Sequence, residues 1–204
     1  ADRVIVGNEV LAEWAHGHAA DVRIVPTCVE PVDYDVRTDW EIGDAGPVLG
    51  WIGSPATERY VLDIAPALAE VHRRTGARLH MISGAGPVPS PLAAFTDKTT
   101  WTPAAERAIA TWDVGLMPLR DGVYERAKCG YKLLQYAASG VPAVGSPVGA
   151  NQVILNGMDG LAPATADDWV DALMTVIAEP ARRRCRRAAA GLDVAAQYSY
   201  AAWE

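Results

Sequence analysis

Short apolar runs alternate with amphipathic stretches along most of the chain. Between the runs, apolar residues recur every three or four positions, which predicts helices with one buried face. The runs themselves have the length and composition of buried strands, and they lie at residues 3–6, 22–25, 48–52, 79–82, 114–119 and 141–144. Strands that alternate with helices predict a parallel sheet covered on both faces. The predicted fold class is therefore α/β, with a Rossmann-like parallel sheet.

A break in this alternation indicates the domain organisation. Residues 27–46 are rich in proline, aspartate and glycine and lack periodicity, which predicts a long loop or a connection between domains. We therefore expect residues 1–46 to be the remnant of a preceding domain with its connecting segment. Residues 47–180 would form the Rossmann-like domain, and residues 181–204 a helical tail.

Local signals predict the ends of several elements. Thr57 is expected to cap a helix that ends at Gly76 and presents one apolar stripe, made of Tyr60, Val61, Ile64, Leu68 and Val71. Residues 103–111 predict a short helix, and residues 120–127 a polar loop. Ligands of open α/β sheets bind beyond the carboxyl ends of the strands. Four candidate loops lie there, at residues 53–57, 83–87, 120–131 and 146–151.

The stretch from Lys128 to Val144 is the most informative part of the chain, because it predicts a helix followed at once by a buried strand. Lys128 and Lys132 share one face near the helix start, where free N–H groups and the helix dipole favour an anion. Gly130 between them would let a ligand approach the backbone. Gln135, one turn further, could hydrogen-bond to hydroxyl groups. The alternative, that both lysines are solvated surface residues, stays open from spacing alone.

Composition excludes several classes of function. The formal net charge is −7, which argues against nucleic acid as a partner. The arginines at residues 182–187 are best explained as a solvated helix face, with contact to an acidic lipid or another anion as the alternative. No apolar run could span a membrane and no signal peptide is recognisable, so nothing in the sequence supports membrane association.

The cysteines and histidines suggest neither a metal site nor nucleophilic catalysis. The three cysteines are widely spaced and form no CxxC pair, which favours a reducing, cytoplasmic compartment. The four histidines are scattered and pair with no serine or cysteine. The glycine loops at residues 53–57 and 84–86 match neither the P-loop nor GxGxxG, and each is best explained as a structural turn.

Several segments together resemble the carboxyl-terminal domain of a GT-B glycosyltransferase. They are similar to the group 1, or family 4, retaining enzymes that use nucleotide sugars, and the likeness extends from Val4 to Tyr200. The segments are DVGLMPL (113–119), KCGYKLLQYAASGVPAV (128–144), SPVGAN (146–151), VPTCVE (25–30), GWIGSPAT (50–57), NGMDGL (156–161) and YSY (198–200).

The resemblance implies the site and the partners. Two Rossmann-like domains face each other in that family: the carboxyl-terminal one holds the nucleotide diphosphate of the donor, and the amino-terminal one binds the acceptor. The donor would be a nucleotide-diphosphate sugar, with no further cofactor and no metal. The residues implied for the donor phosphates and sugar are Gly53, Ser54, Arg59, Lys128, Gly130, Tyr131, Lys132 and Gly149. Those implied for the nucleoside are Gly84, Gly86 and Gln135.

One departure from the family pattern affects catalysis. The family has two glutamates separated by seven residues, and this chain has Ala127 and Gln135 at the two positions. Glutamine can still bind ribose hydroxyls, whereas the contact of the first glutamate with the donor sugar is lost. Glu125 is the nearest carboxylate that could substitute for it.

The sequence therefore predicts the donor-binding half of a retaining hexosyltransferase, a fragment that is inactive without its amino-terminal domain. The first alternative is a nucleotide-binding or regulatory module of the same fold that has lost catalysis. The second is another GT-B enzyme, such as a nucleotide-sugar epimerase.

Overall fold

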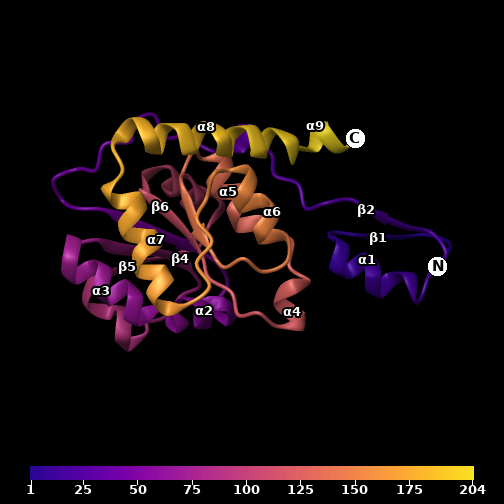
Figure 1. The fold of residues 1–204 in the computed structure, drawn as a ribbon, viewed down its shortest axis with the longest axis horizontal. Helices are drawn as coiled ribbons and strands as arrows, with labels where there is room; N and C mark the ends of the chain where they lie inside the picture. The colour runs from indigo at the N-terminus through magenta and orange to yellow at the C-terminus, as the bar shows by residue number, and fades with distance from the viewer.

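The computed structural model describes residues 1–204, which form a central parallel sheet between two layers of helices and a smaller unit beside it (Figure 1). The five strands of the sheet have the order β5-β4-β3-β6-β7 and are all parallel. Their bounds are Val48–Ile52 (β3), Arg78–Ser83 (β4), Thr96–Thr100 (β5), Val114–Met117 (β6) and Ala143–Gly145 (β7). The predicted fold class is confirmed.

Helices cover both faces of this sheet, as the alternating pattern predicts. One face is covered by α2 (Glu58–Asp63), α3 (Ala65–Thr75) and α7 (Ala166–Ala178). The other face is covered by η4 (Pro103–Thr111), α5 (Tyr131–Ala138), α6 (Ala150–Gly157) and α8 (Ala181–Gln197). The shorter elements are η1 (Pro31–Asp33), η2 (Pro55–Thr57), η3 (Ser90–Phe95), α4 (Val123–Arg126) and α9 (Tyr200–Trp203).

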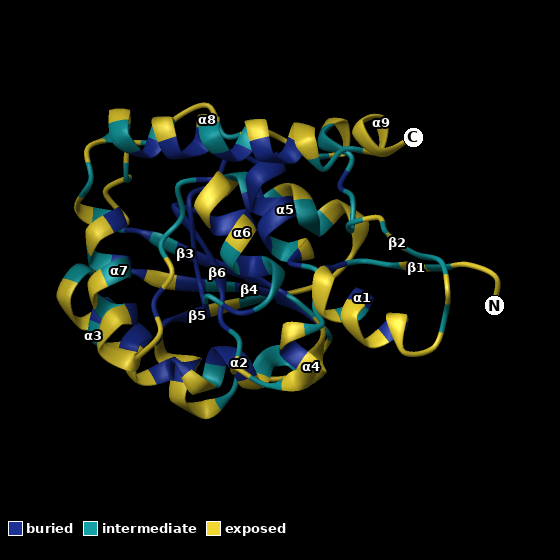
Figure 2. Cartoon of the chain, turned by 45° about the vertical axis from the view of Figure 1, so that its right-hand side comes forward, coloured by how far each residue is buried: buried dark blue, intermediate teal, exposed yellow.

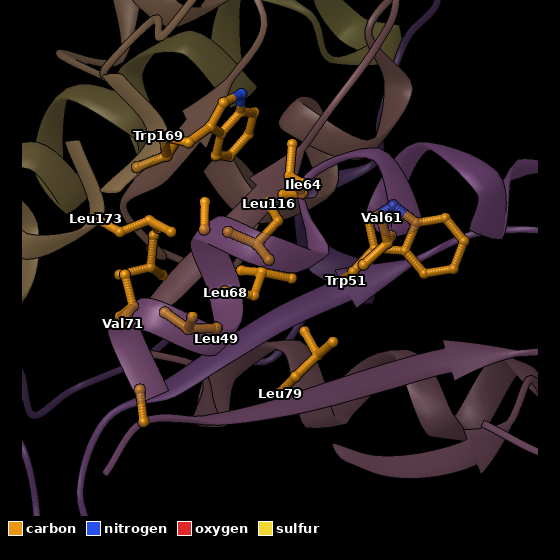
Figure 3. Close-up of a cluster of buried hydrophobic side chains, with 14 of the residues drawn as sticks. Leu49, Trp51, Val61, Ile64, Leu68, Val71, Leu79, Leu116, Trp169 and Leu173 are labelled. Carbon is orange, nitrogen blue, oxygen red and sulfur yellow. The ribbon is translucent and has the colours of Figure 1, made fainter. Parts of the chain in front are cut away.

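Two apolar clusters hold these layers together. The residues of β3 alternate between them: Leu49 and Trp51 belong to one cluster and Ile52 to the other, because successive side chains of a strand point to opposite faces. Figure 3 shows the first cluster, in which Leu68 of α3 and Leu173 of α7 pack over β3. On the opposite face, Gly50 makes room for an indole, since a Cβ there would lie 1.7 Å from Cδ2 of Trp112. The core therefore lies on both sides of β3.

A small unit at the amino terminus lies apart from the main sheet (Figure 1). Its strands β1 (Val4–Val6) and β2 (Val22–Ile24) form a two-stranded parallel sheet, joined by α1 (Glu9–His16). Asn8 caps α1, because its side chain accepts a hydrogen bond from the Leu11 N–H. The Asn8 amide also donates to the Ala127 carbonyl at 2.9 Å, so the capping residue links this unit to the main domain.

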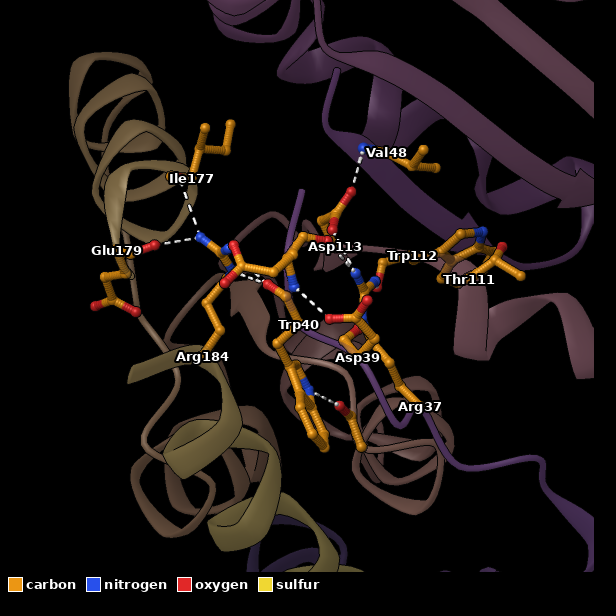
Figure 4. A network of polar contacts seen from close by, with 12 residues as sticks. Arg37, Asp39, Trp40, Val48, Thr111, Trp112, Asp113, Ile177, Glu179 and Arg184 are labelled. Atoms are coloured by element: carbon orange, nitrogen blue, oxygen red, sulfur yellow. Dashed lines mark hydrogen bonds and ion pairs between the residues drawn. The ribbon is translucent and has the colours of Figure 1, made fainter. Parts of the chain in front are cut away.

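The segment between β2 and β3 is held along the main domain by buried polar contacts (Figure 4). The Arg37 guanidinium donates to Asp113 Oδ1 at 2.7 Å, and the other Asp113 oxygen accepts from the Val48 N–H. The Trp40 indole donates to the Gly140 carbonyl at 3.1 Å, and the Trp40 carbonyl accepts from the Arg184 guanidinium. The predicted loop is therefore an ordered segment that contains only η1 as a regular element.

The structure corrects four local predictions. The helix predicted from Thr57 to Gly76 is broken at Ile64, because Pro66 in the first turn of α3 has no N–H to continue the ladder. The Thr57 hydroxyl does not cap it, since it donates to the Ser54 carbonyl at 2.8 Å. Residues 120–127 contain the short helix α4, and α5 begins only at Tyr131, so Lys128 precedes the helix that it was predicted to share with Lys132. The short helix predicted at residues 103–111 is confirmed and is of the 3-10 type.

The arginine-rich segment is not a fully solvated face. One side of α8 is buried and the other exposed (Figure 2). Arg182 and Arg186 are exposed, but Arg184 and Arg187 are buried. Arg187 donates two hydrogen bonds to the carboxylate of Glu179, at 2.8 and 2.6 Å. A buried guanidinium needs such a partner to offset its lost hydration. The spacing of the arginines showed that they share a helix, but not that the helix would turn two of them inward.

Candidate functional site

The carboxyl edge of the sheet has a crevice where the chain changes direction. The central strands β3 and β6 are neighbours, and their helices cover opposite faces: α2 and α3 follow β3, whereas α5 follows β6. Ligands of open α/β sheets bind at such a switch point. A cavity of about 480 Å³ lies here, lined by Ile52, Gly53, Ser54, Pro55, Gly84, Trp101, Glu106, Tyr131, Lys132 and Gln135.

Lys132 places an ammonium group in this cavity from the first turn of α5. Its Nζ lies 5.7 Å from the centre of the Trp51 indole, and no carboxylate oxygen lies within 4.0 Å of it. A Cβ at Gly53 would come within 2.9 Å of the Lys132 Cε, so glycine there leaves room for the lysine stem. Burial, together with the charge of Lys128, lowers the pKa of Lys132 to about 8. The cavity thus contains a desolvated cation without an anion.

A second group of charges lies beside the cavity, around the hydroxyl of Tyr60. This hydroxyl donates to Glu125 Oε1 at 2.5 Å and accepts from Arg59 at 2.9 Å. The Lys128 Nζ lies 3.4 Å from the same hydroxyl and 4.5 Å from the centre of the Tyr60 ring, and 5.0 Å from that of Tyr124. Burial lowers the pKa of Lys128. The hydrogen bond from Tyr60, with the charges of Lys128 and Arg59, lowers the pKa of Glu125.

Together these side chains leave positive charge at the edge of the sheet. Arg59, Lys128 and Lys132 contribute three positive charges, and Glu125 is the single carboxylate that contacts the group. Lys128 and Lys132 are close enough for the charge of Lys128 to depress the pKa of Lys132. The free N–H groups at the start of α5 add to this potential. An anion with about two charges would neutralise the group.

A carboxylate also lines the cavity. Glu106 of η4 accepts a hydrogen bond from the Trp101 indole N–H at 2.8 Å and another from the Gln135 amide at 3.2 Å. The Tyr34 hydroxyl, from the connecting segment, donates to the same carboxylate at 3.3 Å and accepts from the Gln135 amide at 3.2 Å. The cavity is therefore lined by both a cation and a hydrogen-bonding carboxylate.

The structure brings most of the predicted donor-site residues together. Gly53, Ser54, Gly84, Tyr131, Lys132 and Gln135 line the cavity, and Arg59 and Lys128 lie in the charged group beside it. Glu125, the candidate catalytic carboxylate, is hydrogen-bonded to Tyr60 and does not line the cavity.

The three remaining glycines lie in different surroundings. Gly130 has a φ of +71°, and a Cβ there would lie 2.5 Å from Cδ1 of Ile154, so its open side is filled by protein. Gly149 has a φ of +55° and lines a second cavity, of about 400 Å³, between the amino-terminal unit and α6. Gly86 follows β4 with a φ of +133° and does not line the first cavity. Their conformations explain why they are glycines without any ligand.

Sequence reasoning missed Trp101, Glu106 and Tyr60. The first two lie after β5, whose carboxyl end was not among the four predicted loops. The sequence could have indicated Glu106, because it lies in the first turn of a short helix that starts after the N-capping residue Thr102, directly after a strand. Tyr60 was interpreted only as part of an apolar stripe, although a buried tyrosine hydroxyl needs a partner.

Metal binding and membrane insertion would each need a feature of a different kind. No group of three or more histidine, cysteine, aspartate or glutamate side chains is arranged to hold a metal ion. Every helix is too short or too polar to cross a bilayer.

This sheet order, with a ligand-sized cavity at its switch point, is that of a Rossmann-like domain, and it matches one half of the GT-B fold. The sequence model described as "Glycosyl transferases group 1" matches residues 46–179. The chain belongs to this family, and the resemblance stated from its motifs is confirmed. A search of curated proteins finds no match.

Solved structures with the same fold are glycosyltransferases. WaaG, described as involved in lipopolysaccharide biosynthesis, superposes with a TM-score of 0.73 at 14% identity, over 94% of this chain and 58% of WaaG. The apo form of WaaB, an outer core galactosyltransferase, superposes with a TM-score of 0.72 at 18% identity, over 100% of this chain and 59% of WaaB. This chain thus spans less than two thirds of both proteins.

A third structure covers only one domain. The carboxyl-terminal domain of LpcC from Francisella tularensis, a group 1 protein, superposes with a TM-score of 0.62 at 16% identity, over 84% of this chain and 99% of that domain. At such identities the comparisons establish the fold, and the ligand and the reaction are matters for proposal.

Proposed function

We propose that this chain binds the nucleotide-diphosphate sugar donor of a glycosyltransferase. The observation that supports this most directly is Lys132, a partly buried ammonium with no carboxylate within 4.0 Å, in a cavity at the switch point of the sheet. Burial of an unpaired charge costs free energy unless a ligand supplies the opposite charge. A diphosphate would do so, with Arg59 and Lys128 at its outer side.

The size and polarity of the cavity fit a nucleotide. Its volume of about 480 Å³ lies within the range of small-molecule sites. The cation and the carboxylate both line this cavity, so a ligand with phosphates at one end and hydroxyl groups further along would satisfy both. TarM, which has the same fold, was crystallised with UDP and a glycosylated glycerol.

In this proposal, transfer to an acceptor proceeds with retention of configuration and requires an amino-terminal domain outside this chain. Arg59, Lys128 and Lys132 would stabilise the negative charge that develops on the leaving diphosphate. The alternative, a nucleotide-binding module without catalysis, is favoured by one observation. Ala127 replaces the first glutamate of the family, and Glu125 is already bonded to Tyr60.

Titration calorimetry with UDP, GDP and ADP tests the binding proposal. At least one of these should bind, and Lys132→Ala should weaken its binding about tenfold to a hundredfold, because a charge-assisted contact is lost. Binding of the corresponding nucleoside should change little. Arg186→Ala, an exposed arginine on α8, removes the same charge at a distance and should have no effect. Absence of binding by all three diphosphates would refute the proposal.

Catalysis needs a separate assay. The chain is combined with the amino-terminal domain of the same protein, and hydrolysis of the corresponding nucleotide sugars is measured. Turnover that depends on Lys128 and Lys132 supports a transferase, whereas tight binding without turnover supports the module.

A further inference from the structure

The carboxylate of Glu106 is held in place by neutral groups alone. Its Oε1 accepts from the Trp101 indole, and its Oε2 accepts from the Gln135 amide and lies near the Tyr34 hydroxyl. No lysine or arginine nitrogen lies within 4.0 Å of it. A carboxylate oxygen offers two acceptor positions. Glu106 therefore has no cationic partner and has acceptor capacity left for a ligand in the cavity that it lines.

Gln135, by contrast, has used its donors. Its amide nitrogen donates to both Tyr34 and Glu106, each at 3.2 Å. An amide nitrogen has only two hydrogens. Gln135 is also almost fully buried, at 3% exposure. Its amide nitrogen thus positions the Glu106 carboxylate and has no hydrogen left for a ligand.

The distance along α5 relates this carboxylate to the phosphate end of the cavity. Lys132 and Gln135 are three residues apart, which is roughly 4.5 Å along a helix axis. Glu106 is hydrogen-bonded to Gln135, and Glu106, Gln135 and Lys132 line the same cavity. In a nucleoside diphosphate the sugar follows the phosphates at once, and its vicinal hydroxyl groups are strong donors to a carboxylate.

We propose that Glu106, supplied by η4 and not by the helix of the family's glutamate pair, accepts hydrogen bonds from the ribose hydroxyls of the nucleotide. Trp101, Gln135 and Tyr34 are positioning residues that orient its carboxylate toward the cavity. This inference rests on the proposed nucleotide site and adds a positioning role to the ribose contact that the resemblance implies for Gln135, whose carbonyl oxygen stays an acceptor. It also makes Glu106 the residue that selects ribonucleotides over deoxyribonucleotides.

The test compares the diphosphate of UDP, GDP or ADP that binds best with its 2′-deoxy form, by titration calorimetry. The unaltered chain should prefer the ribonucleotide about tenfold to a hundredfold, as expected for hydrogen bonds to a charged group. Glu106→Gln keeps the shape and the acceptor for Trp101 but loses the charge. It should weaken ribonucleotide binding and bring the ratio close to one. Glu13→Gln, at an exposed position of α1, is the matched control.

Each outcome has a distinct meaning. Tyr34→Phe should lower the preference for ribonucleotide partially, while Lys132→Ala should weaken both forms equally and keep their ratio. A ratio that survives in Glu106→Gln, in protein whose thermal transition is unchanged, overturns the role of Glu106. If no diphosphate binds to the unaltered chain, the nucleotide site itself is wrong, and this inference falls with it.

Discussion

Replacing Lys132 by methionine should stabilise the ligand-free chain while removing its affinity for a diphosphate. Methionine keeps the unbranched stem beside Trp51 and removes the unpaired charge. The pKa of Lys132 is lowered from 10.5 to about 8. At roughly 1.4 kcal/mol for each pKa unit, this difference corresponds to about 3 kcal/mol against folding at neutral pH. Because the side chain still borders the open cavity, we expect a gain of about 1 to 2 kcal/mol.

The pH dependence follows from the direction of this change. Between about pH 8 and 10.5 the unfolded chain binds the Lys132 proton and the folded chain does not, so the contribution of Lys132 to stability rises with pH there. Above 10.5 the lysine is neutral in both states and the penalty disappears. As the pH falls through about 8, the full penalty is reached. The advantage of Lys132→Met should therefore be largest at neutral pH and smaller in the alkaline range.

Urea unfolding of both proteins, near pH 7 and near pH 9.5, measures this effect. Arg186→Met is the control, since it removes a solvated charge and should show the same small difference at both pH values. The reasoning is refuted if Lys132→Met is less stable than the unaltered chain near pH 7, or if its advantage does not shrink near pH 9.5.

Two further predictions concern the buried ion pairs. Asp113→Asn removes the charge that compensates Arg37, whose side chain is 11% exposed. The free energy of unfolding, measured in urea, should fall by about 3 to 5 kcal/mol. A loss below about 1 kcal/mol would contradict the role of this pair. Arg187→Leu leaves the carboxylate of Glu179 without its buried partner and should lower the free energy of unfolding by a similar amount. The control Arg182→Leu, at an exposed position of the same helix, should change the free energy of unfolding by less than about 0.5 kcal/mol. Equal effects of the two substitutions would show that burial of Arg187 is irrelevant to stability.

The fold could be predicted because each of its parts has a local signal. The apolar runs at β3, β4 and β6 are short and bounded by glycine or polar residues, and the helices between them present apolar residues at helical spacing. Alternation of the two patterns allows few arrangements other than a parallel sheet with covered faces. The errors occurred where a single residue decided the outcome, as Pro66 does in breaking the predicted helix after β3.

The half of the site next to α5 could also be predicted. Lys132 and Gln135 are three residues apart on α5, so helical geometry alone places them near one another. Lys128 precedes α5 and its N-cap Gly130, so the predicted shared helix face with Lys132 is wrong, and tertiary contacts place it beside the site. The sequence did not reveal that Lys132 lacks an anion. That depends on how closely Trp51 and Gly53 of β3 approach it.

The other half depends on tertiary structure. Tyr34, Trp101, Glu106 and Gln135 meet although they belong to the connecting segment, the end of β5, η4 and α5. No periodicity links these positions, because their separation in space is determined by the packing of η4 and α5 on one face of the sheet. By itself the sequence determined the layers, the ends of the strands where ligands bind, and Lys132 and Gln135 on one helix. Only the folded chain decided the strand order with its switch point and placed the Glu106 carboxylate in the same cavity as Lys132, because charges far apart in sequence become neighbours only after the core has packed.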